Sequence, residues 1–317
     1  MSNCDYNSCF KGINNISQDM LLNILEANFK MYLDWSFLKI GAWFDAEKPQ
    51  ETIYGGNTHY QLLPVSDMSY TDGQVWQGIR KDWVWESGII YENTSPKVIS
   101  DILVDGISVP KTDNFVVSYP TGRVTFYEPI SVSSTVELEY SYRFVQVHRS
   151  SESPWFNIVQ YSSFNTDNQD IQQMENGEWA IGSHHRVQLP CIIIESVPRS
   201  RSRPYEIGNS LLWLEQDIAF YVLAENKNDR NKLLDIIRLQ QDSTLQLFDT
   251  NLVAQNDDFP LDYNEDIKNS PLMYPNLIDQ YNWRKCFIKN VNLIELDSKH
   301  TNFYQGAARA TLEIIST

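Results

Sequence analysis

Basic residues, cysteines and long hydrophobic runs are all scarce in this sequence. The chain has 25 Lys and Arg against 41 Asp and Glu, and its formal net charge is -16. A general nucleic-acid-binding protein needs a basic surface, so this charge disfavours that class, and it also disfavours docking on anionic lipid. The N-terminus is polar and no apolar run approaches a membrane-spanning length, so neither a secretory signal nor a membrane partner is expected. The sequence predicts a chain that is made and folded in a cytoplasm.

The four cysteines do not form a metal-binding or disulfide pattern. Cys4 and Cys9 lie close together near the N-terminus, whereas Cys191 and Cys286 are isolated within apolar segments. No close cysteine pair recurs with histidine at the spacing of zinc ligands. We therefore expect reduced thiols, with Cys191 and Cys286 as small buried hydrophobic residues.

Sequence signatures of catalysis are also missing. There is no phosphate-binding lysine loop, no GxGxxG turn and no nucleophile elbow. His184 and His185 are adjacent, so they point to opposite sides of a strand, and a polar start of a strand explains them more simply than a metal site. Acid pairs such as Asp257 and Asp258 carry little information in a chain with 41 acidic residues. We predict a protein that is not an enzyme, with no cofactor, no metal and no small-molecule ligand.

The clearest pattern in the chain is a run of β-hairpins between residues 102 and 147. Asp105 and Gly106 separate two short apolar segments, which is a strong signal for a two-residue hairpin turn. Residues 115–126 contain a second hairpin around Pro120 and Gly122, where Gly suits a left-handed position. Apolar and polar residues then alternate from Val136 to Phe144, which predicts one long strand with a single buried face.

The chain divides by composition into five expected segments. These are an N-terminal arm over residues 1–16, a helix and strand over 17–45, a β-rich insertion module over 46–148, an irregular connection over 149–178, and an α/β core over 179–317 with a long loop at 242–284. The first segment pairs a helix at about 17–35, capped by Ser17, with a strand at 37–44. The core contains strands at 187–197, 212–222, 286–296 and 303–315, and a helix at 229–240 capped by Asn228. The strand at 187–197 is apolar on both faces around Cys191, so we place it centrally in the sheet.

The predicted fold class is therefore α+β. We expect a mixed or antiparallel sheet with helices on one face, plus an inserted antiparallel β-hairpin module.

Three arginines form the first candidate interaction site. Arg199, Arg201 and Arg203 alternate in a segment expected to be a loop, and in an extended chain they would project together about 7 Å apart. Such an array suits carboxylates on a neighbouring subunit, although a solvated loop tip and contacts with phosphates are alternatives. Acidic residues of the kind that a neighbour could present are Asp101, Glu128, Glu137 and Glu139.

Three tryptophans form the second candidate site. Trp83 and Trp85 are two residues apart and would share one face of a strand, and Trp155 follows further along the chain. Indole rings at the surface serve subunit interfaces or stack on sugars, whereas most tryptophans of this kind simply pack in a core.

Several segments resemble structural proteins of tailed bacteriophages. Four segments of the first half look like β-modules of neck and tail proteins, namely Val104–Ile107, Phe115–Tyr119, Gly122–Phe126 and Val136–Val147. Three segments of the second half resemble the sheet-and-helix core of tail terminator and head–tail joining proteins, namely Pro190–Glu195, Asp217–Ile218 and Asp229–Leu233. The resemblance covers roughly two-thirds of the chain.

This resemblance implies a non-enzymatic component of the virion that assembles in the host cytoplasm. Such proteins form rings at the head–tail neck or at the tail end, and they join the tail to the capsid connector while leaving a bore for DNA. The implied partners are copies of the same chain and other neck, portal or tail-tube proteins, with DNA only as passing cargo. The alternative is a carbohydrate- or receptor-binding module of a phage tail or adhesin that uses exposed tryptophans.

Overall fold

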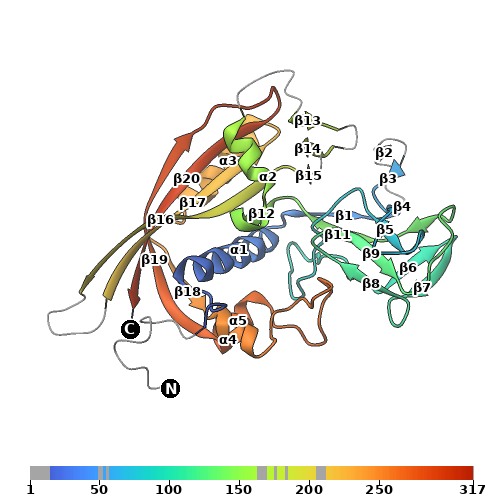
Figure 1. Ribbon diagram of the computed structural model, residues 1–317, viewed down its shortest axis with the longest axis horizontal. Helices are drawn as coiled ribbons and strands as arrows, with labels where there is room; N and C mark the ends of the chain where they lie inside the picture. Colours follow the sequence, from blue (N-terminus) through green and yellow to red (C-terminus); the bar gives the residue numbers. More distant parts are fainter. Residues whose placement is uncertain are drawn as a thin grey trace.

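The computed structural model describes residues 15–48, 53–54, 57–162, 170–174, 177–182, 185–204 and 212–316 (Figure 1). Helices make up 20% and strands 40% of the protein, and the strands form several sheets, antiparallel apart from one parallel pair, that include two curled half-barrels. This confirms the predicted α+β class, with a hairpin module in addition to the main sheet. Residues 1–14 of the expected N-terminal arm, with Cys4 and Cys9, lie outside the described residues, as does His184.

The main sheet has six strands and is mixed. Its order is β12 (Gln146–Arg149), β16 (Cys191–Pro204), β17 (Leu212–Ala224), β20 (Tyr304–Ser316), β19 (Asn282–Glu295) and β18 (Thr244–Phe248). Strands β12 and β16 are parallel, and the other neighbours in this sheet are antiparallel. The interior position of β16 is confirmed, because its first four residues are fully buried between β12 and β17. Cys191 and Cys286 are buried free thiols, as expected.

Two helices cover the inner face of this sheet. These are α1 (Leu21–Lys39) and α3 (Lys227–Arg238), and the sheet curls around α1 in Figure 1. The apolar side of α1 packs on the sheet, with the rings of Phe29 and Phe220 5.4 Å apart. Asn226 caps α3 by accepting a hydrogen bond from the Asp229 N–H, two residues before the expected cap.

The predicted bounds of the first helix and strand were wrong. The helix begins at Leu21 and not at Ser17, because the carboxylate of Asp19 accepts a hydrogen bond from the hydroxyl of Thr250 at 2.8 Å and lies outside the helix. It continues to Lys39, because Phe37 and Leu38 are buried within its last turns. Only the short strand β1 (Trp43–Ala46) follows.

The expected irregular connection at 149–178 contains regular structure. It includes the 3-10 turn η1 (Ser150–Glu152), the helix α2 (Trp155–Tyr161) and the strand β13 (Ile171–Gln173). Strand β13 forms a small sheet with β14 (Trp179–Ile181) and β15 (His185–Val187). This sheet and α2 pack on the outer face of the main sheet, around Ile193 and Leu223. Helix α2 buries only three side chains, too few to produce a periodic signal.

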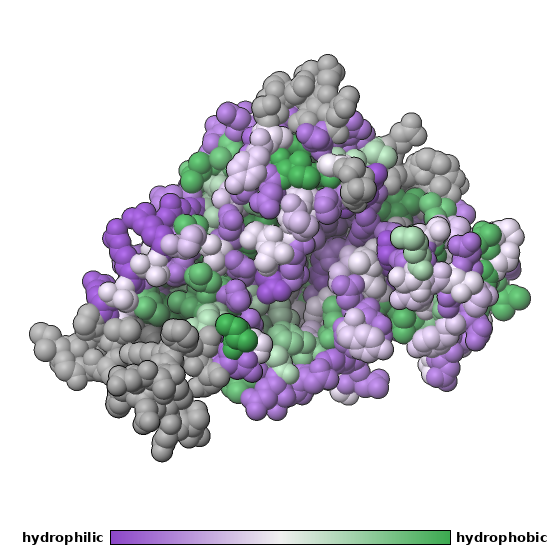
Figure 2. Space-filling model, viewed as in Figure 1, coloured by the Kyte–Doolittle hydropathy of each residue, from purple (hydrophilic) through white to green (hydrophobic). Residues whose placement is uncertain are grey.

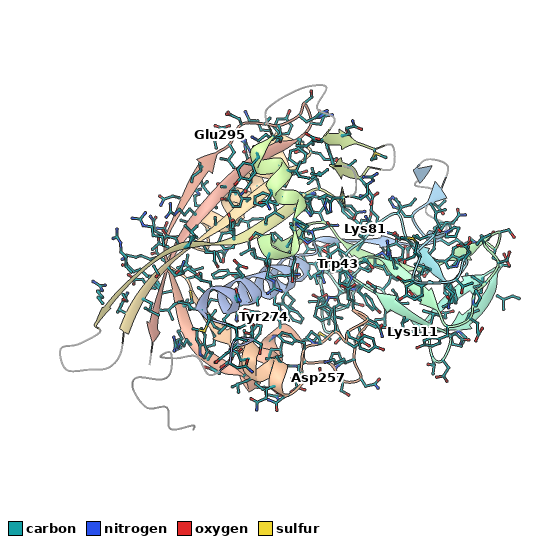
Figure 3. The ribbon with its side chains drawn as sticks, in the orientation of Figure 1. Trp43, Lys81, Lys111, Asp257, Tyr274 and Glu295 are labelled. Carbon is teal, nitrogen blue, oxygen red and sulfur yellow. The ribbon has the colours of Figure 1, made fainter. Side chains whose placement is uncertain are left out.

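The expected long loop at 242–284 is also partly regular. It contains β18 and the short helices α4 (Thr250–Gln255) and α5 (Tyr274–Gln280). These helices form a separate apolar cluster with Phe248 that packs against α1, and Tyr274 lies below α1 in Figure 3. The buried Asn28 of α1 joins the two layers by pairing with the backbone N–H and C=O of Phe248 at 2.9 and 3.0 Å.

The hairpin module forms a seven-stranded antiparallel sheet at the other end of the molecule (Figure 1). Its strand order is β7 (Ile107–Pro110), β6 (Asp101–Val104), β10 (Val136–Glu137), β4 (Gln61–Pro64), β5 (Val75–Gln77), β9 (Arg123–Phe126) and β8 (Phe115–Ser118). Two smaller pairs accompany it, namely β2 (Ile53–Tyr54) with β3 (Asn57–Thr58), and β1 with β11 (Tyr140–Arg143).

Both predicted turns of the module are confirmed. Asp105 and Gly106 join β6 to β7 with φ of 51° and 80°, and Gly122 closes the β8–β9 hairpin with φ of 64°. The single strand expected from Val136 to Phe144 was wrong. It is divided between β10 and β11, which belong to different sheets, so Arg143 is buried even though its position in the alternation places it on the polar face.

A buried ion network joins this module to α1. The Arg143 guanidinium donates two hydrogen bonds of 2.8 Å to Glu86 and one of 3.2 Å to Asp82. Burial raises the pKa of the Asp34 carboxyl of α1 to about 8, although Arg143 opposes this shift. Burial alone would lower the pKa of Arg143, but the acidic groups around it, Glu86 first, then Asp34 and Asp82, together raise it. The guanidinium therefore stays charged and holds two carboxylates inside the protein.

We predict that Arg143→Met destabilises the fold by about 3–5 kcal/mol, because it leaves Glu86 and Asp82 without their buried cation. Urea unfolding followed by circular dichroism measures this loss. Arg238→Met is the matched control, since Arg238 pairs with Asp235 at the exposed end of α3, and it should cost less than about 1 kcal/mol. Equal losses for the two variants would contradict a structural role of the network.

Candidate functional site

The candidate arginines lie on a projecting part of the main sheet. The segment expected to be a loop is the second half of β16, which pairs with β17 as far as Pro204 after a register shift between Ser196 and Ser200. We call residues 197–204 of β16 and 212–216 of β17 the β16–β17 arm. In Figure 1 it extends past α1 to the lower left, away from the hairpin module. Arg199, Arg201 and Arg203 are all exposed on it.

The arm has an unpaired edge. Strand β12 pairs with β16 only from Cys191 to Ile194. Helix α1 then covers Ser196, whose N–H donates to Glu26 at 2.8 Å and whose hydroxyl donates to the Leu22 carbonyl at 3.2 Å. Among the described residues, no strand pairs with β16 on this side beyond that point. The Val197 carbonyl accepts a hydrogen bond from the Gln216 amide at 2.6 Å, and beyond it no strand in the described part of the chain takes up the outward-facing backbone groups of this edge, which suit the addition of another strand.

Charged side chains cover the outer face of the arm and the strands beside it. Arg201 lies opposite Glu215 in the β16–β17 register, and the Arg203 guanidinium lies 5.1 Å from the centre of the Trp213 ring. The Lys289 ammonium bonds Glu215 at 2.8 Å and Glu313 at 2.6 Å. The hydrogen bond from Lys289 lowers the pKa of Glu215, and Arg203 and Arg201 add to this effect. On this face the paired carboxylates of Glu215 and Glu313 therefore lie between Lys289 and the arginines of β16, which form a cationic outer edge.

The structure places the candidate tryptophans in the interior. Trp83 is fully buried, stacks at 4.4 Å on Tyr140, and donates its Nε1–H to the Arg80 carbonyl at 2.7 Å. Trp155 is the first residue of α2 and is buried in the cluster between α2 and the main sheet, and Trp85 is half-buried against the core of the module. Residues 81–90 do not form a strand, so the condition under which Trp83 and Trp85 would share a strand face is not met. A sugar cannot stack on the fully buried indole of Trp83 in this arrangement.

A basic cleft that the sequence did not reveal lies where the core meets the module. Its volume is about 310 Å³, and it is lined by Lys81, Arg123, Arg186, His148 and Trp155 among others. Glu178 pairs with Lys81 at 3.1 Å, and Asp67 lies 3.8 Å from Arg123. Lys81 is labelled at this junction in Figure 3, and Figure 2 shows a hollow with hydrophilic residues around it between the two halves of the molecule. Residues spread over more than 100 positions line this cleft, so no local motif could predict it.

Two further observations concern the chemistry of the described part of the chain. No group of three His, Cys, Asp or Glu side chains there is placed to hold a metal ion. Among the same residues, no helix is long and apolar enough to cross a membrane.

Comparisons with known proteins leave the family open. No protein-family model matches the chain, and no curated protein matches it.

His148 in the basic cleft should make the fold sensitive to mild acid. Burial lowers the pKa of its imidazole to about 4, whereas an unfolded histidine has a pKa near 6.5. The unfolded chain therefore binds a proton first, and stability falls as the pH drops from 6.5 towards 4. Between pH 7 and pH 5 we expect this group alone to cost about 1–2 kcal/mol.

His148→Gln should remove this part of the pH dependence. Urea unfolding of both proteins at pH 7 and pH 5 measures the difference between their slopes. His59, whose pKa burial also lowers to about 4, provides a second case, and His59→Gln should reduce the slope in the same direction. Parallel pH profiles for wild type and His148→Gln would contradict a neutral His148 in the fold.

Proposed function

We propose that this chain is a non-enzymatic structural protein of a tailed-bacteriophage virion. In this proposal it forms a ring at the head–tail neck or at the tail end, joins the tail to the capsid connector, and leaves a bore for DNA. The observation that carries the proposal is the β16–β17 arm, which combines an unpaired strand edge with three exposed arginines on an acidic protein.

An exposed strand edge is a site for adding another strand. Backbone groups along the edge supply hydrogen bonds that are independent of side chains, so a strand from a second molecule can extend the sheet. Charges beside such an edge exclude strands of like charge and favour a partner of opposite charge. Arg199, Arg201 and Arg203 therefore select an acidic partner, and the chain itself carries a net charge of -16.

The acidic surface also fits a protein past which DNA moves. Phosphates are repelled by carboxylates over distances of about 8–10 Å at physiological salt, so an acidic wall does not retain the duplex. The proposed partners are copies of this chain and other neck, portal or tail-tube proteins, with DNA only as passing cargo. Assembly takes place in the host cytoplasm and the product is part of the virion.

Light scattering across a concentration series tests self-assembly directly. We expect the purified chain to form a discrete oligomer whose mass falls at high salt, because the arm contributes charge pairs that salt screens. A monomer throughout the series, or a trimer insensitive to salt, would contradict the ring proposal.

A triple substitution tests the arm. Replacing its three arginines by Gln should shift the mass towards the monomer at a concentration where the wild type is assembled. The matched control replaces three exposed cations of α3 and should leave the mass unchanged. The test set is Arg199→Gln, Arg201→Gln and Arg203→Gln, and the control set is Lys227→Gln, Lys232→Gln and Arg238→Gln. An equal effect of both sets would assign assembly to overall charge and not to the arm.

A further inference from the structure

The hairpin module carries an acidic groove at the end of the molecule opposite the arm. The groove has a volume of about 260 Å³, and Asp101, Glu137 and Glu139 line it together with Lys48 and Lys97. Asp101 begins β6, and Glu137 ends the neighbouring strand β10. Strand β6 lies at the right of Figure 1, whereas the arm lies at the lower left. Three of the four acidic residues that the sequence offered as partners for the arginines are thus brought together.

The groove keeps an excess of negative charge after its own ion pairs are formed. Lys48 pairs with Glu137 at 3.2 Å, and Lys97 pairs with Glu47 at 2.7 Å and with Glu139 at 3.4 Å. The ammonium groups of Lys48 and Lys97 therefore face four carboxylates, which belong to Glu47, Asp101, Glu137 and Glu139. The side chain of Glu139 remains 51% exposed, so it is accessible to a second molecule.

The acidic and basic side chains have the same spacing. The Leu138 N–H donates to the Tyr60 carbonyl at 2.7 Å and continues the pairing between β10 and β4, so the chain is extended there. Leu138 is buried, which turns Glu137 and Glu139 to the opposite face, about 7 Å apart. Arg201 and Arg203 are also two residues apart in a strand. Arginine binds carboxylates through two parallel hydrogen bonds, so it can replace the lysines at this site.

We propose that the arm of one copy docks in the acidic groove of the next copy, an inference that rests on the self-assembly proposed above. An arm paired with another arm would place arginines opposite arginines, which is unfavourable across strands. Arm and groove are different surfaces at opposite ends of the chain, so their contact is head-to-tail. Such a contact closes into a ring when the rotation between copies divides a full turn, and otherwise forms an open helix.

Charge reversal on each surface tests this contact. The arm-reversed variant carries Arg201→Glu and Arg203→Glu, and the groove-reversed variant carries Glu137→Lys and Glu139→Lys. Each should weaken self-association at least about 100-fold, because like charges then meet at the interface. Circular dichroism and thermal unfolding of each variant show that the chains are folded.

The decisive result is that self-assembly returns when the charges of both the arm and the groove are reversed. A variant with all four substitutions again has opposite charges on arm and groove, so it should assemble alone, at a mass equal to that of the wild type. Groove-reversed chains that assemble like the wild type, or a folded fourfold variant that stays monomeric, would overturn the docking of arm in groove.

Failure of the docking and failure of the proposed function give different results. If arm-reversed chains are monomeric while groove-reversed chains assemble, self-assembly through the arm stands and only the groove is rejected. If the wild type itself is monomeric at every concentration, both are rejected.

Discussion

The structure depends on four residues of strand β16 that are buried on both faces of the main sheet. Ile192 and Ile194 point to the inner face and pack in the cluster with α1 and α3. Cys191 and Ile193 point to the outer face and pack with α2 and the small sheet. A fully buried aliphatic side chain contributes about 1.5–3 kcal/mol, so this short segment stabilises both layers at once. Parallel pairing with β12 and antiparallel pairing with β17 fix its position in the sheet.

The same strand changes from core to surface within a few residues. Its first four residues are enclosed, α1 covers Ser196, and the side chains from Pro198 to Arg203 are exposed. A projection that continues a buried strand is held in direction by the core and by its pairing with β17, which resumes at Ser200 after a register shift. The arginines at 199, 201 and 203 are therefore presented on a stiff support, which lowers the conformational entropy lost when a partner binds.

The sequence predicted those parts of the fold in which a long local pattern decides the structure. The central strand at Cys191, the turn at Asp105 and Gly106, and the four long strands of the core all follow from periodicity or turn chemistry. Helix α2 and helices α4 and α5 were missed, because each has six or seven residues and buries two or three side chains. Their positions are determined by contacts with distant strands, which a local pattern does not contain.

For the same reason, the sequence predicted some residues of the candidate site and missed others. The alternation of Arg199, Arg201 and Arg203 is a local pattern, and all three side chains are exposed, although the segment is a strand and not the expected loop. The basic cleft and the network around Arg143 are assembled from distant segments. The burial of Trp83 depends on Tyr140, which lies 57 positions later in the chain and stacks on its ring. Spacing alone could not separate a surface tryptophan from a core tryptophan here.

The pairing of β1 with β11 has a consequence for how such a protein can diversify. Trp43 lies opposite Arg143 and Ala46 opposite Tyr140, so the chain enters and leaves the hairpin module at adjacent points. A short turn between these two strands would preserve the connection from α1 to β12. The module can therefore be shortened, enlarged or exchanged in evolution without a change in the path of the chain through the core. Any replacement must still neutralise Arg143 beside α1 and satisfy the other polar contacts between module and core, such as the Lys111–Asp266 ion pair and the hydrogen bond from the Gln188 amide to the Ile79 carbonyl.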